Sequence, residues 1–192
     1  MNIMTTKESK HLLRKEMQNK LQTINEQVKA EASSVITSII HSLDQYKRCS
    51  IIYGYIPLGG EPDLAPLYDI ALKEGKAVAF PVCSSNYEMS YHLVNTDWRN
   101  HLVKSSFGNY EVHSGLIAQP DKSDCALILV PGLAFSPKGE RLGRSMGFFD
   151  RFLAQRRSDC PAVGVCFAIQ LLETLPTEGH DYLVDLVVSE AF

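Results

Sequence analysis

The run Ala126-Leu127-Ile128-Leu129-Val130 is apolar throughout, and a polar segment follows it: Gly139-Glu140-Arg141-Leu142-Gly143-Arg144-Ser145-Met146-Gly147-Phe148-Phe149-Asp150-Arg151. A continuous apolar run of this length is typical of a strand that a parallel sheet buries on both faces. Similar short apolar runs occur at residues 50–55, 77–82, 162–167 and 183–188. Between most of these runs lie segments with helical character, at 64–73, 148–156 and 169–174. Strands that alternate with helices predict an α/β fold around a largely parallel sheet.

The N-terminal part has a different pattern. Residues 7–43 contain neither proline nor glycine and have helical periodicity, but Thr23-Ile24-Asn25-Glu26 fits a capping box. We therefore predict two helices, and we expect the second to turn one apolar stripe toward the core. That stripe consists of Val28, Ala32, Val35, Ile36, Ile39 and Leu43. The prediction for residues 1–192 is a single three-layer domain, in which residues 1–45 form a helical pair and residues 89–93 a half-exposed strand.

Composition excludes several classes of protein. The net charge of -3 argues against a general nucleic-acid binder, which is usually basic. The sequence has no apolar run near the ~20 residues that span a bilayer, and its N-terminus lacks the apolar core of a signal peptide. Five scattered cysteines without a Cys-x-x-Cys pair indicate reduced thiols. We expect a cytoplasmic protein without a membrane or nucleic-acid partner, monomeric or possibly dimeric.

Ligands of open α/β sheets bind at the carboxyl ends of the strands, and two loops there are conspicuous. One is 55–62, and the other is 139–151. Around the second loop, residues 138–157 contain six basic and two acidic residues. Glycines, arginines and a helix start suit phosphate oxygens, although the loop is neither a Walker loop nor Gly-x-Gly-x-x-Gly. The composition fits a phosphate-binding loop and a solvated turn equally well.

Several charged residues are candidates, each with a purely structural alternative. Asp150 suits Mg²⁺ or the positive end of a helix dipole, and Asp185 is a second carboxylate that could converge on it. Lys10 and Arg14 lie one helical turn apart and share a face, which by itself favours a solvated surface. Glu61 follows two glycines, where it could bind the donor edge of a substrate ring or cap the next helix. The six histidines have neither metal-ligand spacing nor a catalytic motif, and we interpret them as surface or structural residues.

Taken together, these residues resemble the 5-formyltetrahydrofolate cyclo-ligase family, also called 5,10-methenyltetrahydrofolate synthetase. The resemblance extends over nearly the whole chain and is strongest from Val130-Pro131-Gly132-Leu133-Ala134-Phe135 to Gly143. Its other parts are Lys10-His11-Leu12-Leu13-Arg14, Glu61, Pro81, Met89-Ser90-Tyr91, Gly108-Asn109-Tyr110-Glu111, Gln170, Leu175-Pro176, His180-Asp181 and Val184-Asp185.

The resemblance implies that the chain uses ATP and Mg²⁺ to convert 5-formyltetrahydrofolate to 5,10-methenyltetrahydrofolate, releasing ADP and phosphate. It implies that Arg141 and Arg144 neutralise charge during catalysis. Ile56 and Glu61 correspond to folate contacts, and Asp150 and Asp185 to magnesium ligands. The residues that correspond to the ATP site are Lys10, Arg14, Arg141, Leu142, Gly143, Arg144, Ser145, Met146, Gly147, Phe148 and Phe149.

The chain departs from the family pattern inside this loop. The family usually has Arg-Leu-Gly-x-Gly-x-Gly-Tyr-Tyr-Asp, whereas this chain has Ser145 for the middle glycine, Met146, and two phenylalanines for the tyrosines. A serine adopts a positive φ less readily than glycine, at a cost of about 1–2 kcal/mol. Two alternatives follow: a folate-binding homologue with weakened or lost catalysis, or an ATP-dependent enzyme acting on another formyl or carboxyl compound.

Overall fold

The computed structural model describes residues 5–85, 88–105, 108–112 and 125–192. One of the six histidines, His113, lies outside the described residues. The described helices include none that is both long and apolar enough to pass through a membrane.

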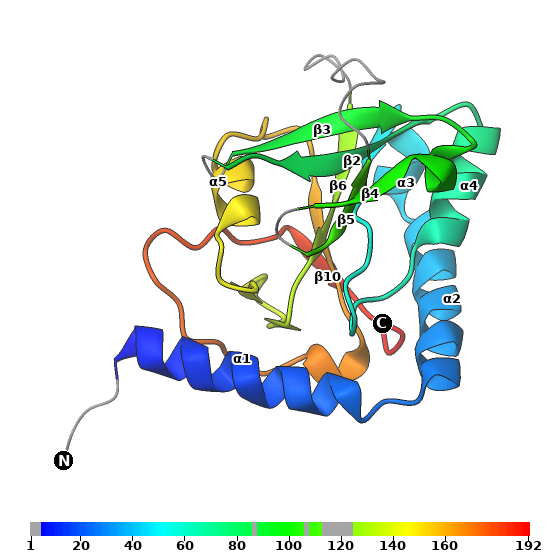
Figure 1. The fold of residues 1–192 in the computed structure, drawn as a ribbon. Coiled ribbons are helices and arrows are strands. Elements are labelled where there is room, and N and C mark those ends of the chain that lie inside the picture. Colours follow the sequence, from blue (N-terminus) through cyan, green and yellow to red (C-terminus); the bar gives the residue numbers. More distant parts are fainter. Residues whose placement is uncertain (1–4, 86–87, 106–107, 113–124) are drawn as a thin grey trace.

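A six-stranded sheet in the order β10-β9-β6-β1-β2-β3 forms the centre of the fold (Figure 1). Its strands are β1 (Ile51–Tyr53), β2 (Ala77–Cys83), β3 (Met89–Val94), β6 (Ala126–Pro131), β9 (Ala162–Val165) and β10 (Leu186–Val188). All neighbouring strands run parallel except β2 and β3, which are antiparallel. The predicted α/β fold with a largely parallel sheet is therefore confirmed. Two small antiparallel pairs were not predicted: β4 (Leu102–Lys104) with β5 (Tyr110–Val112), and β7 (Ala134–Phe135) with β8 (Arg141–Leu142).

The two faces of the sheet carry separate apolar cores, because neighbouring strand residues point to opposite sides. Ile52 belongs to a core with residues of α1, α2 and α4, whereas Ile51 belongs to a core with Leu153 of α5. The helices are α1 (Thr6–Gln22), α2 (Glu26–Ser42), α3 (Asp44–Arg48), α4 (Ala65–Lys73) and α5 (Phe148–Ala154), with 3-10 turns η1 (Trp98–His101) and η2 (Ala168–Gln170). The result is a three-layer arrangement with helices on both faces (Figure 1).

The break between the two N-terminal helices was predicted correctly, but the capping residue was not. Asn25, rather than Thr23, caps α2, and its side chain accepts a hydrogen bond from the Gln27 amide at 2.7 Å. Thr23 ends α1, where its hydroxyl donates to the Lys20 carbonyl at 2.7 Å. The predicted core stripe of α2 is wrong in part, since Val28 and Val35 are about half exposed. The buried residues of α2 are Ala32, Ser33, Ile36, Thr37 and Ile40.

The predicted helix at 169–174 is also wrong. Only the short turn η2 forms, and the chain then becomes extended, because the Leu172 amide donates to the Phe135 carbonyl at 2.9 Å and Leu171 pairs with Phe135. The fully buried Gln170 fixes this geometry by donating to the Gly132 carbonyl at 2.8 Å. Tertiary hydrogen bonds outweigh the local helical pattern here.

Candidate active site

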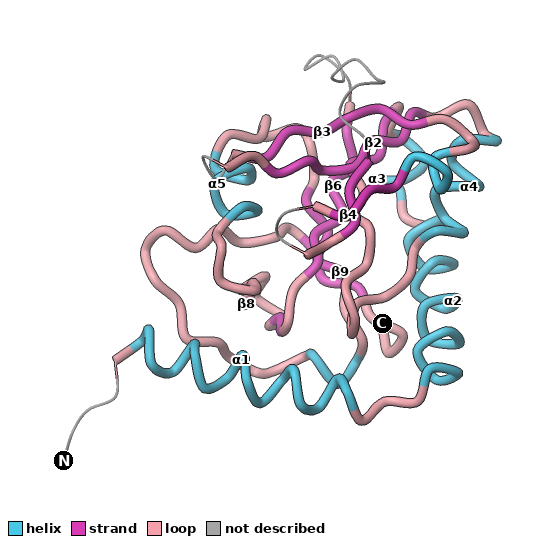
Figure 2. The backbone as a smooth tube through the Cα atoms, in the orientation of Figure 1, coloured by secondary structure: helices cyan, strands magenta, loops and turns pink. Residues whose placement is uncertain are grey.

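A cavity of about 890 Å³ opens where the predicted loops meet. One wall is α1, and a second is the loop that follows β1. The segment from Arg141 to Arg151 forms a third wall, and residues of the 178–182 segment complete the lining. In Figure 2 the segment around β8 lies between α1 and α5, so that elements far apart in sequence meet at this place. All candidate site residues predicted from the sequence line this cavity except Asp185.

On the α1 wall, Lys10 is a buried cation held by two carboxylates. Its Nζ lies 2.7 Å from Glu178 Oε2 and 2.6 Å from Asp181 Oδ2, and only 4% of the residue is exposed. Burial alone would lower the pKa of Lys10, but the hydrogen bonds to Asp181 and Glu178 outweigh it and raise that pKa. Lys10 is therefore a fixed positive charge at the cavity.

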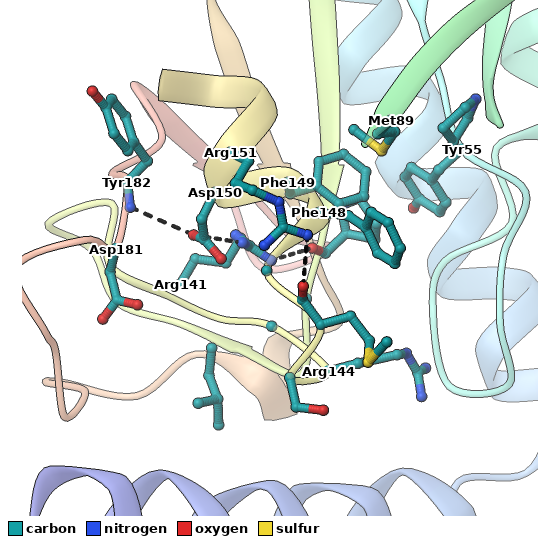
Figure 3. A pocket seen from close by; sticks show the side chains of 18 of the residues that line it. Tyr55, Met89, Arg141, Arg144, Phe148, Phe149, Asp150, Arg151, Asp181 and Tyr182 are labelled. Atoms are coloured by element: carbon teal, nitrogen blue, oxygen red, sulfur yellow. Dashed lines mark hydrogen bonds and ion pairs between the residues drawn. The ribbon is translucent and has the colours of Figure 1, made fainter. Parts of the chain in front are cut away.

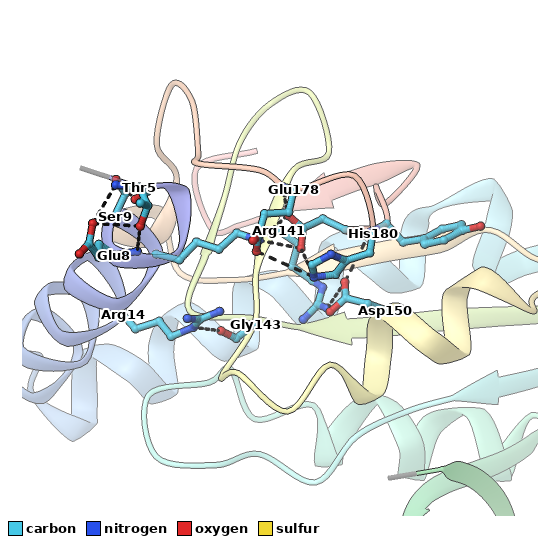
Figure 4. A network of polar contacts seen from close by, with 12 residues as sticks. Thr5, Glu8, Ser9, Arg14, Arg141, Gly143, Asp150, Glu178 and His180 are labelled. Atoms are coloured by element: carbon cyan, nitrogen blue, oxygen red, sulfur yellow. Dashed lines mark hydrogen bonds and ion pairs between the residues drawn. The ribbon is translucent and has the colours of Figure 1, made fainter. Parts of the chain in front are cut away.

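One turn further along α1, Arg14 contacts the glycine-rich loop directly. Its Nε donates to the Gly143 carbonyl at 2.8 Å, which ties α1 to the segment that follows β8 (Figure 4). Arg14 shares a helical face with Lys10, as the spacing predicted, and that face is turned to the cavity rather than to bulk solvent.

Within the glycine-rich loop, Arg141 pairs with Asp150 across the start of α5 (Figure 3). The Arg141 Nη2 to Asp150 Oδ1 distance is 2.8 Å, and the guanidinium lies over the Phe149 ring at 5.7 Å from its centroid. Arg141 is buried, yet its Nε has no hydrogen-bond partner among the described residues. A buried donor without a partner costs about 1–3 kcal/mol.

The loop after β1 presents a buried carboxylate to the same cavity. Glu61 Oε1 lies 2.9 Å from Arg144 Nε, and Glu61 Oε2 accepts from the Leu58 amide at 2.8 Å. Burial raises the pKa of Glu61, although the charge of Arg144 and the Leu58 hydrogen bond act in the opposite direction. Arg144 also donates to the Gly59 carbonyl at 3.0 Å, so it joins the glycine-rich loop to the Glu61 loop. Ile56 lies on the same wall.

The backbone of the loop is strained at the residue that the sequence singled out. Ser145 has a φ of 109°, and it is the one residue other than glycine with a positive φ in the described part of the chain. Gly147, two residues later, has a φ of 66° and precedes α5. Serine thus adopts here a conformation that favours glycine.

The 178–182 segment reaches the cavity because of close packing at Gly139. Gly139 has a φ of 85°, and a Cβ atom on it would collide with the Val184 carbonyl oxygen. The Val184 amide donates to the Gly139 carbonyl at 2.9 Å, which fixes the C-terminal segment against the loop. Three residues before Val184, Asp181 then points into the cavity (Figure 3).

Asp185, in contrast, is not among the residues that line the cavity. Both of its carboxylate oxygens contact Arg156, at 2.5 and 2.8 Å, and one of them accepts from the Ala162 amide at 2.7 Å. The hydrogen bonds from Arg156 lower the pKa of Asp185. These contacts place Asp185 in an ion pair with Arg156 beside β9, outside the cavity lining, and its expected role as a magnesium ligand together with Asp150 stays a prediction.

Besides Glu61, the carboxylates that line the cavity together with Asp150 are Glu178 and Asp181. The Tyr182 amide nitrogen lies 3.5 Å from Asp150 Oδ1. Asp181 directly precedes Tyr182 in the chain, so it is adjacent in sequence to a residue that contacts Asp150. Glu178, His180 and Asp181 have ligand atoms within 4.8 Å of one another. The sequence resemblance included His180-Asp181 without giving either residue a role, and an acidic loop has no spacing rule that would have assigned one.

The charge of the lining differs from that of the whole chain. Its described residues include six lysine and arginine side chains and four carboxylates, an excess of two positive charges in a chain of net charge -3. Such a lining suits a polyanion, and the carboxylate oxygens are hard ligands of the kind that Mg²⁺ prefers. The residues present therefore fit a magnesium–nucleotide pair.

Comparisons with known proteins point to one family. A sequence model of the 5-formyltetrahydrofolate cyclo-ligase family matches residues 6–190. A probable 5-formyltetrahydrofolate cyclo-ligase of Schizosaccharomyces pombe is 28% identical over 175 residues, covering 84% of this chain and 85% of that protein. A 5-formyltetrahydrofolate cyclo-ligase of Mycolicibacterium smegmatis is 30% identical, with 72% of each chain covered. The NMR structure of Aquifex aeolicus 5,10-methenyltetrahydrofolate synthetase superposes with a TM-score of 0.79 at 32% identity, covering 94% of this chain and 89% of that one.

Proposed function

Because the chain belongs to the 5-formyltetrahydrofolate cyclo-ligase family, we propose that it converts 5-formyltetrahydrofolate and ATP to 5,10-methenyltetrahydrofolate, ADP and phosphate. The observation that carries the proposal is that one cavity joins the α1 cations, the glycine-rich loop and the buried carboxylate Glu61. These three features have separate origins in the sequence, and a reaction between a nucleotide and a folate needs all of them at one place.

The nucleotide occupies the positive side of the cavity. Lys10, Arg14 and Arg141 all line it, and their positive charges suit phosphate oxygens. Residues 142–149 contribute the surrounding backbone and the two phenylalanine rings. Forked arginine donors and a lysine charge are the groups that hold phosphate oxygens in proteins.

The folate occupies the opposite side, beside Ile56 and Glu61. The amino and ring N–H groups of the pterin are donors, and the Glu61 carboxylate is a buried acceptor that can receive them. The charge of Arg144 acts against the effect of burial on the pKa of this carboxyl group, and Arg144 contributes positive charge from the boundary between the two sides.

The reaction joins the two sides in two chemical steps. The formyl oxygen attacks the γ-phosphorus of ATP, the bond to the bridging oxygen breaks, and ADP leaves. The folate nitrogen N10 then attacks the activated formyl carbon, loses its proton, and the carbon–oxygen bond breaks to release phosphate. Positioning and charge neutralisation supply most of the catalysis, so a protein nucleophile is unnecessary. Arg141 and Arg144 are the residues proposed to neutralise the transferred charge.

Magnesium belongs to the proposal as the partner of the nucleotide. When bound, the ion neutralises phosphate charge. Asp150 and Asp181, which both line the cavity, are proposed to hold it. The pair Asp150 and Asp185 expected from the sequence is the alternative, and it requires Asp185 to leave Arg156. Since Asp181 is bound to Lys10 in this structure, metal binding would release Lys10 toward a phosphate.

The setting of the reaction is also a proposal. All five cysteines are free thiols, as we expect in the reducing cytoplasm, and the chain is proposed to act there as a monomer.

The experiment is a cyclisation assay. Methenyltetrahydrofolate absorbs in the near ultraviolet, and we expect that absorbance to rise only when ATP, Mg²⁺ and 5-formyltetrahydrofolate are all present. Absence of product at high enzyme concentration, together with calorimetric binding of folate alone, would instead identify a folate-binding homologue without catalysis.

A further inference from the structure

Arg151 lies in the cavity wall, next to the proposed magnesium ligand Asp150, and the reaction above does not use it. Its Nη2 donates to the Met146 carbonyl at 2.9 Å, and its guanidinium lies over the Phe148 ring at 5.4 Å from the centroid. Figure 3 shows the side chain reaching back over Phe148 to the turn before α5. Arg151 therefore contacts two separate parts of the loop that lines the cavity.

The turn that Arg151 contacts contains the strained residue. Met146, whose carbonyl accepts the hydrogen bond, directly follows Ser145, with its φ of 109°. A non-glycine residue in such a conformation persists only when surrounding contacts hold it, because relaxed alternatives are lower in local energy. The hydrogen bond from a charged guanidinium to the next carbonyl is a contact of sufficient strength.

Gly147 shows how closely the guanidinium fits. A Cβ atom at Gly147 would lie 2.9 Å from Arg151 Nη1, and the backbone there has a φ of 66°. Even a methyl group would require the end of the guanidinium to shift. The absence of a side chain at Gly147 therefore has two uses: it allows the positive φ, and it lets the Arg151 guanidinium lie close to the backbone.

From these contacts we infer that Arg151 is a positioning residue, which holds the strained Ser145–Gly147 turn in the conformation that binds ATP. The effect of Arg151 on ATP binding rests on the proposed function, whereas its role in holding the turn rests on the contacts alone. It makes a specific prediction: the need for Arg151 should depend on the strain at Ser145.

The test is a double-mutant cycle with Arg151→Met, Ser145→Gly and the double variant. Arg151→Met should raise the KM for ATP about tenfold, the factor that corresponds to loss of one charged hydrogen bond, and change the KM for folate less than twofold. In the Ser145→Gly background the same substitution should raise the KM for ATP only about threefold, because the turn no longer has to be held against strain. Arg151→Lys, which keeps the charge but not the planar fork, should resemble Arg151→Met.

Arg157→Met is the matched control, since it removes an arginine near the same helix that pairs with Asp159 and does not line the cavity. It should leave both KM values unchanged. Equal effects of Arg151→Met in the two backgrounds, or full rescue by lysine, would overturn the inference in favour of a direct charge effect on phosphate. If Arg151→Met changes the KM for ATP and the KM for folate by the same factor and lowers Tm strongly, Arg151 has only a general structural role and the inference is wrong.

Hydrogen exchange separates this inference from the proposed function. In the chain without nucleotide, Arg151→Met should speed amide exchange of residues 145–149 about tenfold, whereas exchange in β6 should not change. If exchange is unaltered, the inference fails whatever the activity is. If exchange rises but the unsubstituted chain makes no product, the turn-holding role stands and the proposed reaction fails.

Discussion

The two walls of the cavity bury charges of opposite sign. On the α1 wall, Lys10 is buried, with 5% of its side chain exposed, and its partners Glu178 and Asp181 lie on a surface segment. On the facing wall, Glu61 is buried, with 4% of its side chain exposed, and its partner Arg144 is 29% exposed. On each wall the buried side chain has the charge that suits the proposed ligand: Lys10 suits phosphate, and Glu61 suits the pterin donors. The oppositely charged partner of each is the more exposed residue of the pair. A buried charge needs a partner, and a ligand of the same sign as that partner can replace it.

Removal of the buried cation on the α1 wall should have the largest effect. Lys10→Met should lower kcat/KM for ATP by about 10²–10³, because one preorganised donor to the phosphates is lost. Initial rates at varied ATP measure the effect. The matched control is Lys15→Met, an exposed lysine of the same helix that does not line the cavity. If both variants lose activity equally, the α1 wall has no special role.

The two candidate metal acids differ in position, and this difference can be tested. Asp181→Asn should raise the Mg²⁺ concentration required for half-maximal rate by about 10–100-fold, since Asp181 lines the cavity. Asp185→Asn should change that concentration little and lower Tm instead, because Asp185 pairs with Arg156. Magnesium titrations of the rate check both expectations. The reverse result would restore the pair first expected from the sequence.

On the facing wall, Glu61→Gln should raise the KM for 5-formyltetrahydrofolate by about tenfold or more, because an amide replaces a charged acceptor for the pterin donors. The KM for ATP should rise less. Asp63→Asn is the control, since the Asp63 carboxylate accepts a hydrogen bond from the Ala65 amide at the start of α4 and is outside the cavity lining. A larger effect on ATP than on folate would mean that the two sides have been assigned the wrong way round.

Glu61 should also leave a signature in stability. Because burial raises its pKa above the ordinary value of 4.5, the folded chain holds this proton more tightly than the unfolded chain. Its contribution to stability is fully present below pH 4.5 and is lost as the pH rises through the raised folded-state pKa. Urea unfolding across this range should show the unsubstituted chain losing stability relative to Glu61→Gln. If the stability of the two proteins depends on pH in the same way, the pKa of Glu61 is not raised in the folded chain.

The smallest expected effect is at Ser145. Ser145→Gly should raise the free energy of unfolding by about 1 kcal/mol, since the strain of a positive φ disappears while a glycine adds freedom to the unfolded chain. Thermal and urea unfolding measure the change. A substitution at the neighbouring Met146, such as Met146→Leu, should leave stability within about 0.5 kcal/mol because Met146 is exposed.

Strands buried on both faces were predicted better from the sequence than short helices. The apolar run of β6 predicted a buried parallel strand correctly, because burial on both faces requires an unbroken apolar run. The segment at 169–174 had a helical pattern but became extended, because Gln170 and Leu172 make hydrogen bonds to residues about 37 positions earlier. A local apolar pattern does not predict the structure of a segment whose hydrogen bonds are made to distant backbone groups.

The candidate site shows the same limit. Lys10 and Arg14 were recognised from spacing and resemblance, since both lie on one face of a single helix. Glu178 and Asp181 were missed, and Arg151 was given no role, because their contacts lie in segments that carry no periodic pattern. The ion pair between Asp185 and Arg156 could not be foreseen for a related reason, since only the fold brings these two residues together.

By itself, the sequence determined the α/β class, the family and the loop at 139–151, because apolar periodicity and local motifs are properties of neighbouring residues. Tertiary structure alone decided which carboxylates face the cavity. That choice depends on Gly139, where the absence of a side chain lets the Val184 backbone pack against the loop and carries Asp181 to the site. A contact between segments 45 residues apart has no local signature, since it depends on how the chain folds between them.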